Sequence, residues 1–297
     1  MNTDVSVVIP CYNVEKWIEG QVGALLPQLG PDDELVLVDN RSTDGSAEIL
    51  ERLSRDDPRV RVVQAFDRAG VNHARNTGLR AARNDVILIC DADDRVHPGW
   101  VEAFRQALRD GGIAGGVVTP VDADGRRIGP DRDLHEIFHG PAYPIGANMG
   151  LTRDVLEAVH GFDESFVGGH DEADFAWRAA RAGFQTHAAP GARIDYLQRP
   201  DARSALTQRR NYARTAIQLW ARHPDVADRN GVSLKGAVRG VLTGLPTWLK
   251  VRRGTATLDE ASSWGWSLGL LEGHLRYRVL GRPPQPLIPP SQEGTAP

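Results

Sequence analysis

Cysteine is scarce in this chain, which has only Cys11 and Cys90 among its 297 residues. Two cysteines in a chain of this length do not make the disulfide framework on which small secreted domains depend. Each of them ends an apolar run, where a buried thiol is ordinary. We therefore expect a reduced protein whose hydrophobic core is large enough to fold without covalent cross-links.

Long apolar runs are also missing. The chain opens MNTDVSVVIP, without the basic segment and apolar stretch of a secretory signal peptide. No uninterrupted apolar run approaches the roughly 18 residues that indicate a membrane-spanning helix. These absences favour a cytoplasmic location, with the inner face of the cell membrane left open.

Glycine-rich phosphate-binding loops are the third absence. No G-x-G-x-x-G follows the first expected strand, and no G-x-x-x-x-G-K-[ST] occurs anywhere. This excludes the two glycine-rich motifs that commonly hold a nucleotide phosphate. If the protein binds a diphosphate, we expect a carboxylate-bound metal ion to neutralise it instead.

Charge is distributed unevenly, although the net charge is only −4. Residues 203–253 contain eleven Lys or Arg and two Asp, so this segment is strongly basic and the remainder acidic. Such asymmetry can indicate an anionic partner, and it can equally be the solvated face of helices. Nucleic acid is not expected, because stacking aromatics are not interleaved with the basic residues.

Residues 1–200 alternate between strand-like and helix-like patterns, as in a parallel sheet flanked by helices. Expected strands cover 5–9, 34–39, 60–64, 86–90 and 192–196, and expected helices 14–29, 46–53, 74–82, 97–111, 152–160 and 172–182. Residues 122–145 are rich in Asp, Gly, Pro and His, and we expect loops there. The predicted fold class is α/β, with residues 1–200 as one domain.

Residues 201–283 have only helical patterns and are expected to form a helical C-terminal extension. Thr257 and Glu260 have the spacing of a capping box, and an apolar stripe from Leu258 to Val279 follows. Before this stripe in the chain, a second apolar helical face is expected, which consists of Val238, Leu242, Leu245 and Trp248. We favour packing of this face on the rest of the protein, or a homodimer, over contact with a membrane surface. Residues 284–297 hold several prolines and are expected to be a disordered tail.

Polar clusters follow three of the four early strands. They are Pro10-Cys11-Tyr12-Asn13, Asp39-Asn40-Arg41-Ser42-Thr43-Asp44 and Asp91-Ala92-Asp93-Asp94. Ligands of open α/β sheets bind beyond the carboxyl ends of the strands, so parallel strands would bring all three clusters to one crevice.

Each cluster suits one part of a nucleoside diphosphate. Tyr12 offers a flat ring beside a base, and Asp39 and Asn40 offer hydrogen bonds to the base and ribose. Asp91 and Asp93 are the expected ligands of Mn²⁺ or Mg²⁺, because hard cations prefer carboxylate oxygens and often include phosphate oxygens in the same coordination shell. D-x-D also occurs by chance, so the three clusters together carry this prediction.

A second group of acids lies at His170-Asp171-Glu172-Ala173-Asp174. Helical spacing places Asp171, Asp174 and Arg178 on one face, with Glu172 pointing elsewhere. One of these acids could act as a general base beside a substrate. The alternative is a helix N-terminus enriched in acids because they suit the helix dipole.

The four blocks VSVVIPCYN, LVLVDNRSTDGS, ARNTGLRAARNDVILICDADD and GFDESFVGGHDEADFAWRAARAGF resemble the family 2 glycosyltransferases of GT-A fold, in their order and spacing. The resemblance covers residues 4–196. It implies an inverting, metal-dependent transferase that moves a sugar from a nucleotide-sugar to an acceptor hydroxyl.

The resemblance also implies roles for individual residues. Those implied to contact the nucleotide are Pro10, Tyr12, Asn13, Asp39, Asn40, Arg75, Asp91 and Ala92. Asp91 and Asp93 would hold the metal. Asp94, Asn148 and Trp177 are expected on the sugar or acceptor side. Members often carry a late histidine near the metal, but residues 192–199 have none and Tyr196 stands there instead.

The catalytic base is expected to be Glu172, which stands where the family usually has Asp. Asp171 is the second choice, because it stands where the family has Glu. The expected donor is a UDP-sugar, and the acceptor a glycan or a lipid-linked glycan. Two alternatives remain: a nucleotidyltransferase, which the first loop PCYNVEKW disfavours, and a catalytically idle sugar-nucleotide-binding scaffold.

Overall fold

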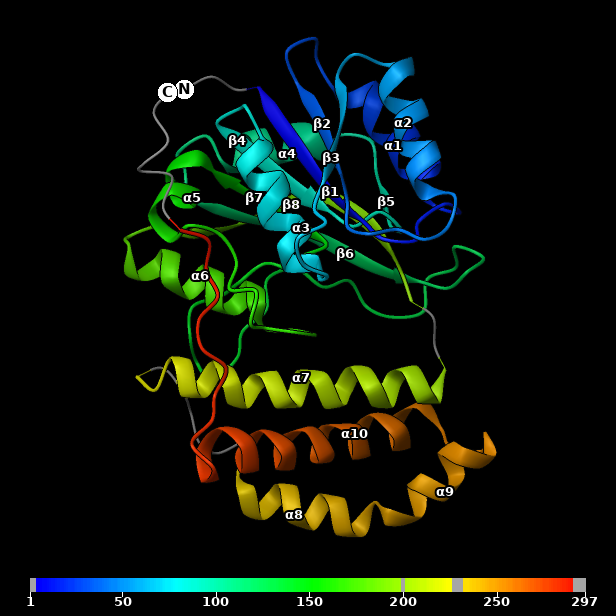
Figure 1. The fold of residues 1–297 in the computed structure, drawn as a ribbon, viewed down its shortest axis with the longest axis vertical. Coiled ribbons are helices and arrows are strands. Elements are labelled where there is room, and N and C mark those ends of the chain that lie inside the picture. The colour runs from blue at the N-terminus through cyan, green and yellow to red at the C-terminus, as the bar shows by residue number, and fades with distance from the viewer. Residues whose placement is uncertain (1–3, 199–200, 226–231, 291–297) are drawn as a thin grey trace.

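The computed structural model describes residues 4–198, 201–225 and 232–290. An α/β unit comprising most of residues 4–197 lies above a layer of helices (Figure 1). The strands are β1 (Val5–Cys11), β2 (Glu34–Asp39), β3 (Val60–Gln64), β4 (Val86–Cys90), β5 (Arg95–Val96), β6 (Ile113–Val121), β7 (Asn148–Thr152) and β8 (Thr186–Leu197). The helices of this unit are α1 (Ile18–Leu25), α2 (Ser46–Asp56), α3 (Val71–Ala81), α4 (Trp100–Ala107), α5 (Arg153–Val159) and α6 (Asp171–Arg181), with a short 3₁₀ turn, Leu26–Gln28.

The described strands form one eight-stranded sheet in the order β3-β2-β1-β4-β7-β6-β8-β5. Strands β1 to β4 are mutually parallel, β7 is antiparallel to both β4 and β6, and β8 runs parallel to β6. The predicted fold class, a mostly parallel sheet flanked by helices, is confirmed. Since β1, β2 and β4 are parallel, the three polar clusters that follow them meet at one edge of the sheet.

Both faces of the sheet are covered by helices, which explains the nearly continuous apolar runs of the first strands. Along β1, Val7 and Ile9 point into a core that includes α1, α2 and α4, and Val8 points into a second core with α3, α5 and α6. The alternation of side chains along a strand requires this division.

Strands β6 and β7 were not predicted, and their glycines explain why. Glycine weakens a strand pattern, but it also marks close approach of another backbone or side chain. A Cβ on Gly116 would lie 2.2 Å from the carbonyl oxygen of Ala192, and a Cβ on Gly150 would lie 2.8 Å from Leu88. These positions are strand because neighbouring strands and helices pack there.

The C-terminal helices are α7 (Ala202–Arg222), α8 (Leu234–Thr243), α9 (Leu245–Arg253) and α10 (Leu258–Gly273), followed by a π-helical turn, His274–Val279. Helix α10 lies between α7 and α8 (Figure 1). The capping box is present, since Glu260 N donates to Thr257 Oγ1 (3.2 Å) and Thr257 N to Glu260 Oε2 (3.0 Å). No helix in the described part of the chain is long and apolar enough to cross a membrane.

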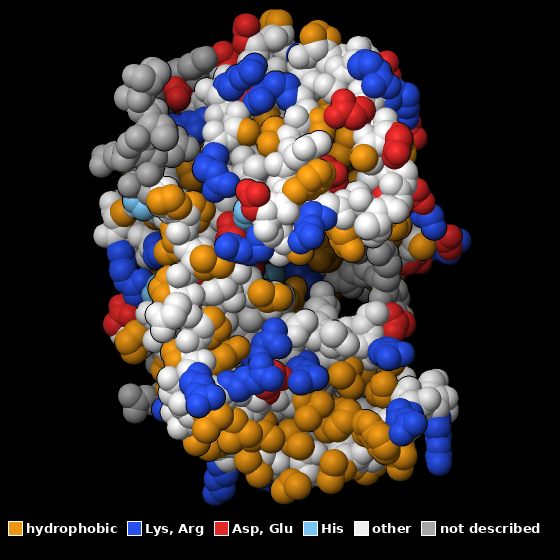
Figure 2. Space-filling view, in the orientation of Figure 1, with side chains coloured by type: hydrophobic (Ala, Val, Ile, Leu, Met, Phe, Trp, Pro, Cys, Tyr) orange, Lys and Arg blue, Asp and Glu red, His pale blue; other side chains and the backbone are white. Residues whose placement is uncertain are grey.

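The apolar face formed by Val238, Leu242, Leu245 and Trp248 is exposed. The expectation that it packs on the rest of the protein is wrong, because α8 turns Ala237 toward α10 instead. Figure 2 shows hydrophobic side chains gathered over this lower end of the molecule.

Close packing of α10 on α7 depends on three glycines at four-residue spacing, Gly265, Gly269 and Gly273. A Cβ on Gly269 would lie 2.1 Å from the carbonyl oxygen of Arg210, so the two helices would have to move apart. We predict that Gly269→Ala lowers the free energy of unfolding by about 1–3 kcal/mol, as overpacking does. Chemical denaturation measures this change.

Gly23→Ala is the matched control for this prediction, because Gly23 is an exposed helical glycine in α1 with open space around it. There the better helix propensity of alanine should stabilise the protein by up to about 1 kcal/mol. Equal effects of the two substitutions would contradict the packing argument.

Residues 284–290 do not form the expected disordered tail. They run along the α/β unit, where Leu287 N donates to Asp163 Oδ1 (2.8 Å) and Glu164 N donates to the carbonyl oxygen of Leu287 (2.9 Å). Proline restricts the backbone, but it does not prevent an extended segment from docking. Residues 291–297 lie outside the described part of the chain.

Candidate active site

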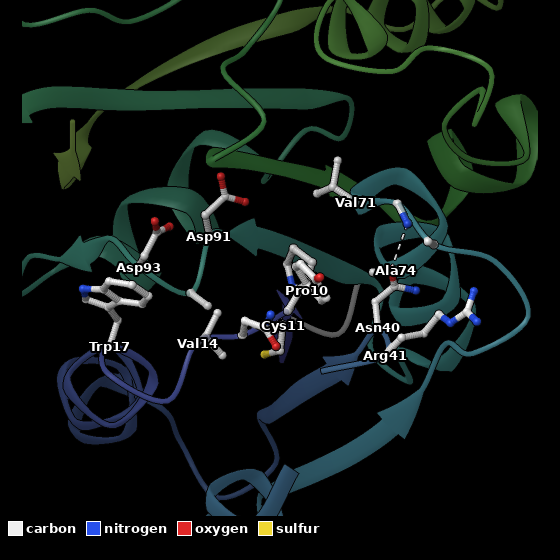
Figure 3. A pocket seen from close by; sticks show the side chains of 15 residues that line it. Pro10, Cys11, Val14, Trp17, Asn40, Arg41, Val71, Ala74, Asp91 and Asp93 are labelled. Atoms are coloured by element: carbon white, nitrogen blue, oxygen red, sulfur yellow. Dashed lines mark hydrogen bonds between the residues drawn. The ribbon is translucent and has the colours of Figure 1, made fainter. Parts of the chain in front are cut away.

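A first cavity of about 620 Å³ opens at the carboxyl ends of β1, β2 and β4 (Figure 3). Its lining residues are Pro10, Cys11, Tyr12, Asn13, Val14, Trp17, Asn40, Arg41, Ala69, Gly70, Val71, Ala74, Asp91, Ala92 and Asp93. Asp91 and Asp93 lie on the side next to Trp17, and Asn40 and Arg41 on the opposite side. Tyr12 stands at the rim with 61% of its surface exposed.

Two asparagines hold the loops that form this cavity. Asn13 Oδ1 accepts from Thr43 N (2.8 Å), which joins the loops after β1 and β2. Asn40 Nδ2 donates to the carbonyl oxygens of Ala65 and Arg68, and its Oδ1 accepts from Gly70 N (2.8 Å). The buried side chain of Asn40 therefore shapes the cavity wall through these bonds.

Asp39 is not among the residues that line this cavity, and its expected contact with the base and ribose stays a prediction. Its side chain is buried below the loop, where Oδ1 accepts from Ser42 N (3.1 Å). It sits beside Cys11, and burial together with the Asp39 charge raises the pKa of that thiol. Asp39 thus shapes the loop after β2.

The loop after β4 is fixed from the neighbouring helix α1. Gln21 Nε2 donates to the carbonyl oxygen of Asp91 (3.0 Å), and Gln21 Oε1 accepts from Val96 N (3.1 Å). Asp91 keeps 29% of its side-chain surface exposed. The buried Gln21 therefore sets the direction in which this acidic loop faces.

Asp94 is buried and is not among the residues that line the two cavities, so its expected contact with the sugar or acceptor stays a prediction. Its Oδ1 accepts from Leu197 N (3.1 Å), which fixes the end of β8 beside the acidic loop. Burial, together with the charges of Asp91 and Asp93, raises the pKa of Asp94 well above its usual range. No hydrogen-bond donor for its Oδ2 is found among the described residues.

Asn148 and Trp177 were also expected near the sugar or acceptor, and both lie in the core instead. Asn148 is fully buried; its Oδ1 accepts from Trp100 Nε1 (2.7 Å), and its Nδ2 donates to the carbonyl oxygens of Val117 and Ala192. Trp177 is buried and donates from Nε1 to the carbonyl oxygen of Pro141 (2.8 Å). A sequence pattern cannot separate a polar core cross-link of this kind from a ligand contact.

A second cavity of about 650 Å³ adjoins the first, and the two share Val71 and Asp91. Its lining residues are Val71, Arg75, Asp91, Ile145, Ala147, Gly168, Gly169, Asp171, Glu172, Tyr196, Arg203, Ser204, Thr207, Gln208, Asn211 and Tyr212. One wall is the first half of α7, and the opposite wall is the start of α6.

Close approach of α7 to the start of α6 depends on Gly169, which has φ +135°. A Cβ there would lie 2.3 Å from the ring of Tyr212. The residues that α7 contributes to the second cavity were not predicted as site residues. Arg203 was seen only as part of a basic segment, since nothing local in the sequence places α7 against α6.

Arg75 joins the acids of the two cavities. This buried side chain donates from Nη1 to Asp171 Oδ2 (3.1 Å) and from Nη2 to Asp91 Oδ1 (3.3 Å), and Nη1 lies 3.8 Å from Glu172 Oε1. Glu172 Oε1 also accepts from Gly146 N (3.2 Å). Asp171 and Glu172 thus converge on one guanidinium, contrary to the expectation that Glu172 points away.

The two acids at the start of α6 differ in their surroundings. The side chain of Asp171 is 6% exposed and that of Glu172 18% exposed. Burial and the neighbouring Glu172 raise the pKa of Asp171 well above its usual range, although Arg75 opposes the shift. Glu172 is the more exposed of the two acids in the second cavity, so it is the better placed to accept a proton from a ligand.

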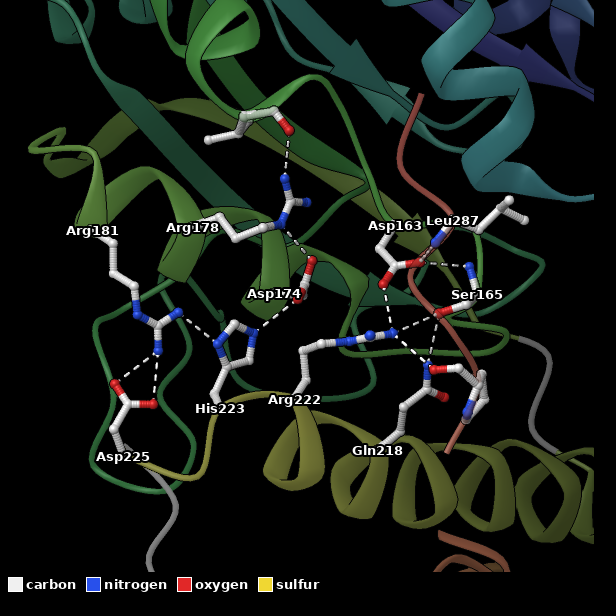
Figure 4. Close-up of polar contacts among 12 residues, drawn as sticks. Asp163, Ser165, Asp174, Arg178, Arg181, Gln218, Arg222, His223, Asp225 and Leu287 are labelled. Atoms are coloured by element: carbon white, nitrogen blue, oxygen red, sulfur yellow. Dashed lines mark hydrogen bonds and ion pairs between the residues drawn. The ribbon is translucent and has the colours of Figure 1, made fainter. Parts of the chain in front are cut away.

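Asp174, the third acid of α6, is not among the residues that line the two cavities, and it ties α6 to the end of α7 (Figure 4). It accepts from Arg178 Nε (2.8 Å) and pairs with His223 Nε2 (2.8 Å). Nearby, Arg222 Nη2 donates to Asp163 Oδ2 (2.9 Å). These contacts hold α7, and with it one wall of the second cavity, on the α/β unit.

The residues present fit a divalent cation that shares its shell with a ligand. Asp91 and Asp93 line the same cavity, and an oxygen of Asp94 without a hydrogen-bond partner lies in the same loop. Over the described ranges, no group of three His, Cys, Asp or Glu side chains is arranged to hold a metal. Phosphate oxygens and water would therefore have to complete the shell.

Comparison with known proteins agrees with this architecture. The family model described as Glycosyl transferase family 2 matches residues 6–169. The glycosyltransferase GlyG of Streptococcus pneumoniae is 36% identical to this chain over 110 residues. These residues are 37% of this chain and 36% of GlyG, so the match spans about a third of the length of that relative. The succinoglycan biosynthesis protein ExoA of Rhizobium meliloti is 24% identical over 274 residues, 84% of this chain and 81% of ExoA.

Among solved structures, the mannosyltransferase PcManGT from Pyrobaculum calidifontis, in complex with GDP-Man and Mn²⁺, has a TM-score of 0.58 and 19% identity, over 89% of this chain and 86% of that one. TarS 1-349 of S. aureus, in complex with UDP-GlcNAc, has a TM-score of 0.54 and 17% identity, over 94% and 92%. At these identities the likeness concerns the fold.

Proposed function

This chain belongs to glycosyl transferase family 2, and on that premise we propose that it transfers a sugar from a nucleoside-diphosphate donor to an acceptor hydroxyl, with inversion at the anomeric carbon. The observation that carries the proposal is the pair of adjoining cavities with Asp91 at their border and Glu172 in the second. One cavity would hold the nucleotide and the other the acceptor.

The first cavity offers suitable groups for a nucleotide. Tyr12 provides a ring at the rim, Asn40 and Arg41 line one side, and Asp91 and Asp93 lie opposite. Asp91 and Asp93 would hold Mn²⁺ or Mg²⁺, which when bound supplies positive charge to the departing diphosphate. The nucleotide is proposed to be UDP or GDP, since the two neighbouring structures hold donors of these kinds.

The second cavity places Glu172 as the proposed general base. As the acceptor oxygen bonds to the anomeric carbon, the bond from that carbon to the diphosphate oxygen breaks, and the acceptor proton passes to Glu172. The nucleoside diphosphate leaves on the side opposite the new bond, so the configuration inverts. Arg75 is proposed to orient Asp171 and Glu172, because its guanidinium lies within 3.8 Å of both.

The acceptor is proposed to be a glycan, free or lipid-linked, in polysaccharide synthesis. The similarity to ExoA supports this class. The open cavity wall contributed by Arg203, Ser204, Thr207 and Gln208 offers several hydrogen-bonding groups to a polyhydroxylated ligand.

A thermal-shift series tests the proposal without knowledge of the acceptor. UDP and GDP, each with and without Mn²⁺, are added to the full chain. We expect one of them to raise the melting temperature only when the metal is present, because a ligand that binds the native state stabilises it. Slow metal-dependent hydrolysis of the matching nucleotide-sugar is expected as well. Binding without hydrolysis would favour an idle scaffold, and no binding in any combination would refute the proposal.

A further inference from the structure

An exposed apolar stripe runs along two consecutive helices, α8 and α9. Within each helix its aliphatic members are spaced by four residues, which places them on one face of that helix. They are Leu234, Val238, Leu242, Leu245 and Leu249, and Trp248 lies beside them; each is between 37% and 61% exposed. Helix α9 follows α8 directly after Gly244, and Pro246 stands in its first turn, where a helix accepts proline.

The stripe faces outward from the whole molecule. Helix α8 packs on α10 with its opposite side: Gly240 lies against Ser267, and Trp264 Nε1 donates to the carbonyl oxygen of Val241 (3.4 Å). Helix α10 separates α8 from α7 and the α/β unit (Figure 1). The described residues of this chain therefore leave the apolar face open, and an exposed apolar patch of this kind marks an interaction site.

Positive charges predominate around the stripe. Residues 232–258 contain five cations, Lys235, Arg239, Lys250, Arg252 and Arg253, and no Asp or Glu; Lys250 pairs with Glu260 at the start of α10. All five side chains are exposed. The guanidinium of Arg252 lies over the ring of Trp248 (4.9 Å to the centroid), so a cation borders the apolar surface directly. A helical surface with an apolar stripe between cations is the pattern of helices that lie in a membrane interface.

A second copy of this chain suits the face poorly. In a two-fold dimer the same patch contacts itself, so the cations of one copy would face those of the other without a carboxylate from residues 232–258. An anionic bilayer offers both an apolar interior for the leucines and negative headgroups for the cations.

We propose that the α8–α9 face, defined as the six apolar and five basic residues above, docks on the surface of an anionic lipid bilayer. The leucines and Trp248 enter the boundary between headgroups and acyl chains, and the cations contact the headgroup phosphates. The contact is peripheral, since no described helix can span the bilayer. This inference concerns only the helical layer and does not depend on the proposed transferase activity.

Flotation of the full chain with vesicles tests the docking. We expect binding to vesicles of phosphatidylcholine and phosphatidylglycerol, much weaker binding to phosphatidylcholine alone, and release at high salt because salt screens the attraction. Arg239→Gln/Arg253→Gln should weaken the partitioning by roughly 30-fold, from about 1 kcal/mol for each cation near the surface. Leu242→Ser/Leu249→Ser should weaken it at least about tenfold, since apolar burial is lost.

Matched controls come from the α/β unit. Ile128→Ser removes an exposed aliphatic side chain, and Arg55→Gln/Arg80→Gln removes two exposed cations; both variants should bind vesicles as the unchanged chain does. All altered positions are exposed, so melting temperatures should agree, which separates lost docking from lost folding.

Three results would overturn the proposal: no binding to anionic vesicles, equal binding to neutral ones, or unchanged binding by both α8–α9 variants. Light scattering adds a fourth. If the chain does not bind vesicles but forms a dimer, and Leu242→Ser/Leu249→Ser dissociates that dimer, then the face is an interface between copies.

Discussion

Glu172→Gln should lower kcat by about 10²–10⁴-fold, the usual contribution of a positioned general base. Glutamine has the shape of glutamate, and its amide oxygen can still accept the hydrogen bond from Gly146 N. It cannot take a proton from the acceptor. The fold and the donor affinity should therefore stay unchanged, and steady-state kinetics together with calorimetric titration of the nucleotide would measure both.

Asp171→Asn is the matched comparison for Glu172→Gln. Asp171 is more buried than Glu172 and is held by Arg75, and burial raises its pKa. We expect its loss to affect turnover less than the loss of Glu172. If Glu172→Gln retained full turnover and Asp171→Asn did not, the base would be Asp171 and the proposed assignment would be wrong.

Asp93→Asn should weaken metal-dependent nucleotide binding by at least about 100-fold, or roughly 2.7 kcal/mol. The substitution replaces a charged carboxylate, the preferred ligand of Mn²⁺ and Mg²⁺, with a neutral amide of the same shape. Asp93 is the better target than Asp91, because Asp91 also pairs with Arg75 and its loss would disturb the second cavity.

Calorimetric titrations with and without Mn²⁺ decide this prediction. In the presence of a chelator, the variant and the unchanged chain should bind the nucleotide equally weakly. Asp56→Asn, which removes an exposed carboxylate at the end of α2, should behave as the unchanged chain does. Equal nucleotide affinity of Asp93→Asn and the unchanged chain in Mn²⁺ would show that Asp93 does not hold the metal.

The predictions for Glu172→Gln and Asp93→Asn test separate assignments, so one can be refuted while the other holds. Loss of turnover in Glu172→Gln with normal metal-dependent binding in Asp93→Asn would keep the base and refute the metal assignment. The reverse result would keep the nucleotide site and move the base elsewhere in the second cavity. Both variants place neutral amides where carboxylates stood, so neither is expected to disturb the core.

Local sequence patterns predicted the elements that build the first cavity. The apolar runs at 34–39 and 86–90 are strands because both faces of a parallel sheet are covered, and such strands read as continuous apolar segments. Thr257 and Glu260 predicted a capping box because a cap involves only four consecutive residues. The clusters after β1, β2 and β4 were placed at one edge of the sheet because parallel strands have their carboxyl ends together.

Several residues expected at the ligand lie away from the cavities, because polar side chains were judged by residue type alone. Asn148 and Asp94 are as polar as Asp91, yet they bond to core groups and to the end of β8. Strands β6 and β7 were missed because their glycines weaken the local pattern and are explained only by close neighbours. The exposed face of α8 and α9 was misjudged because an apolar stripe looks the same whether it is covered or open.

The sequence by itself determined the α/β order, the family resemblance and the acids at the strand ends, since these depend on residues close together in the chain. Only the tertiary structure decided that Arg75 meets Asp171, 96 residues away, and that α7 walls a second cavity beside Asp91. It also decided that the stripe on α8 and α9 stays uncovered. These features arise where segments distant in the sequence pack together, and a local sequence pattern does not reveal which of them will do so.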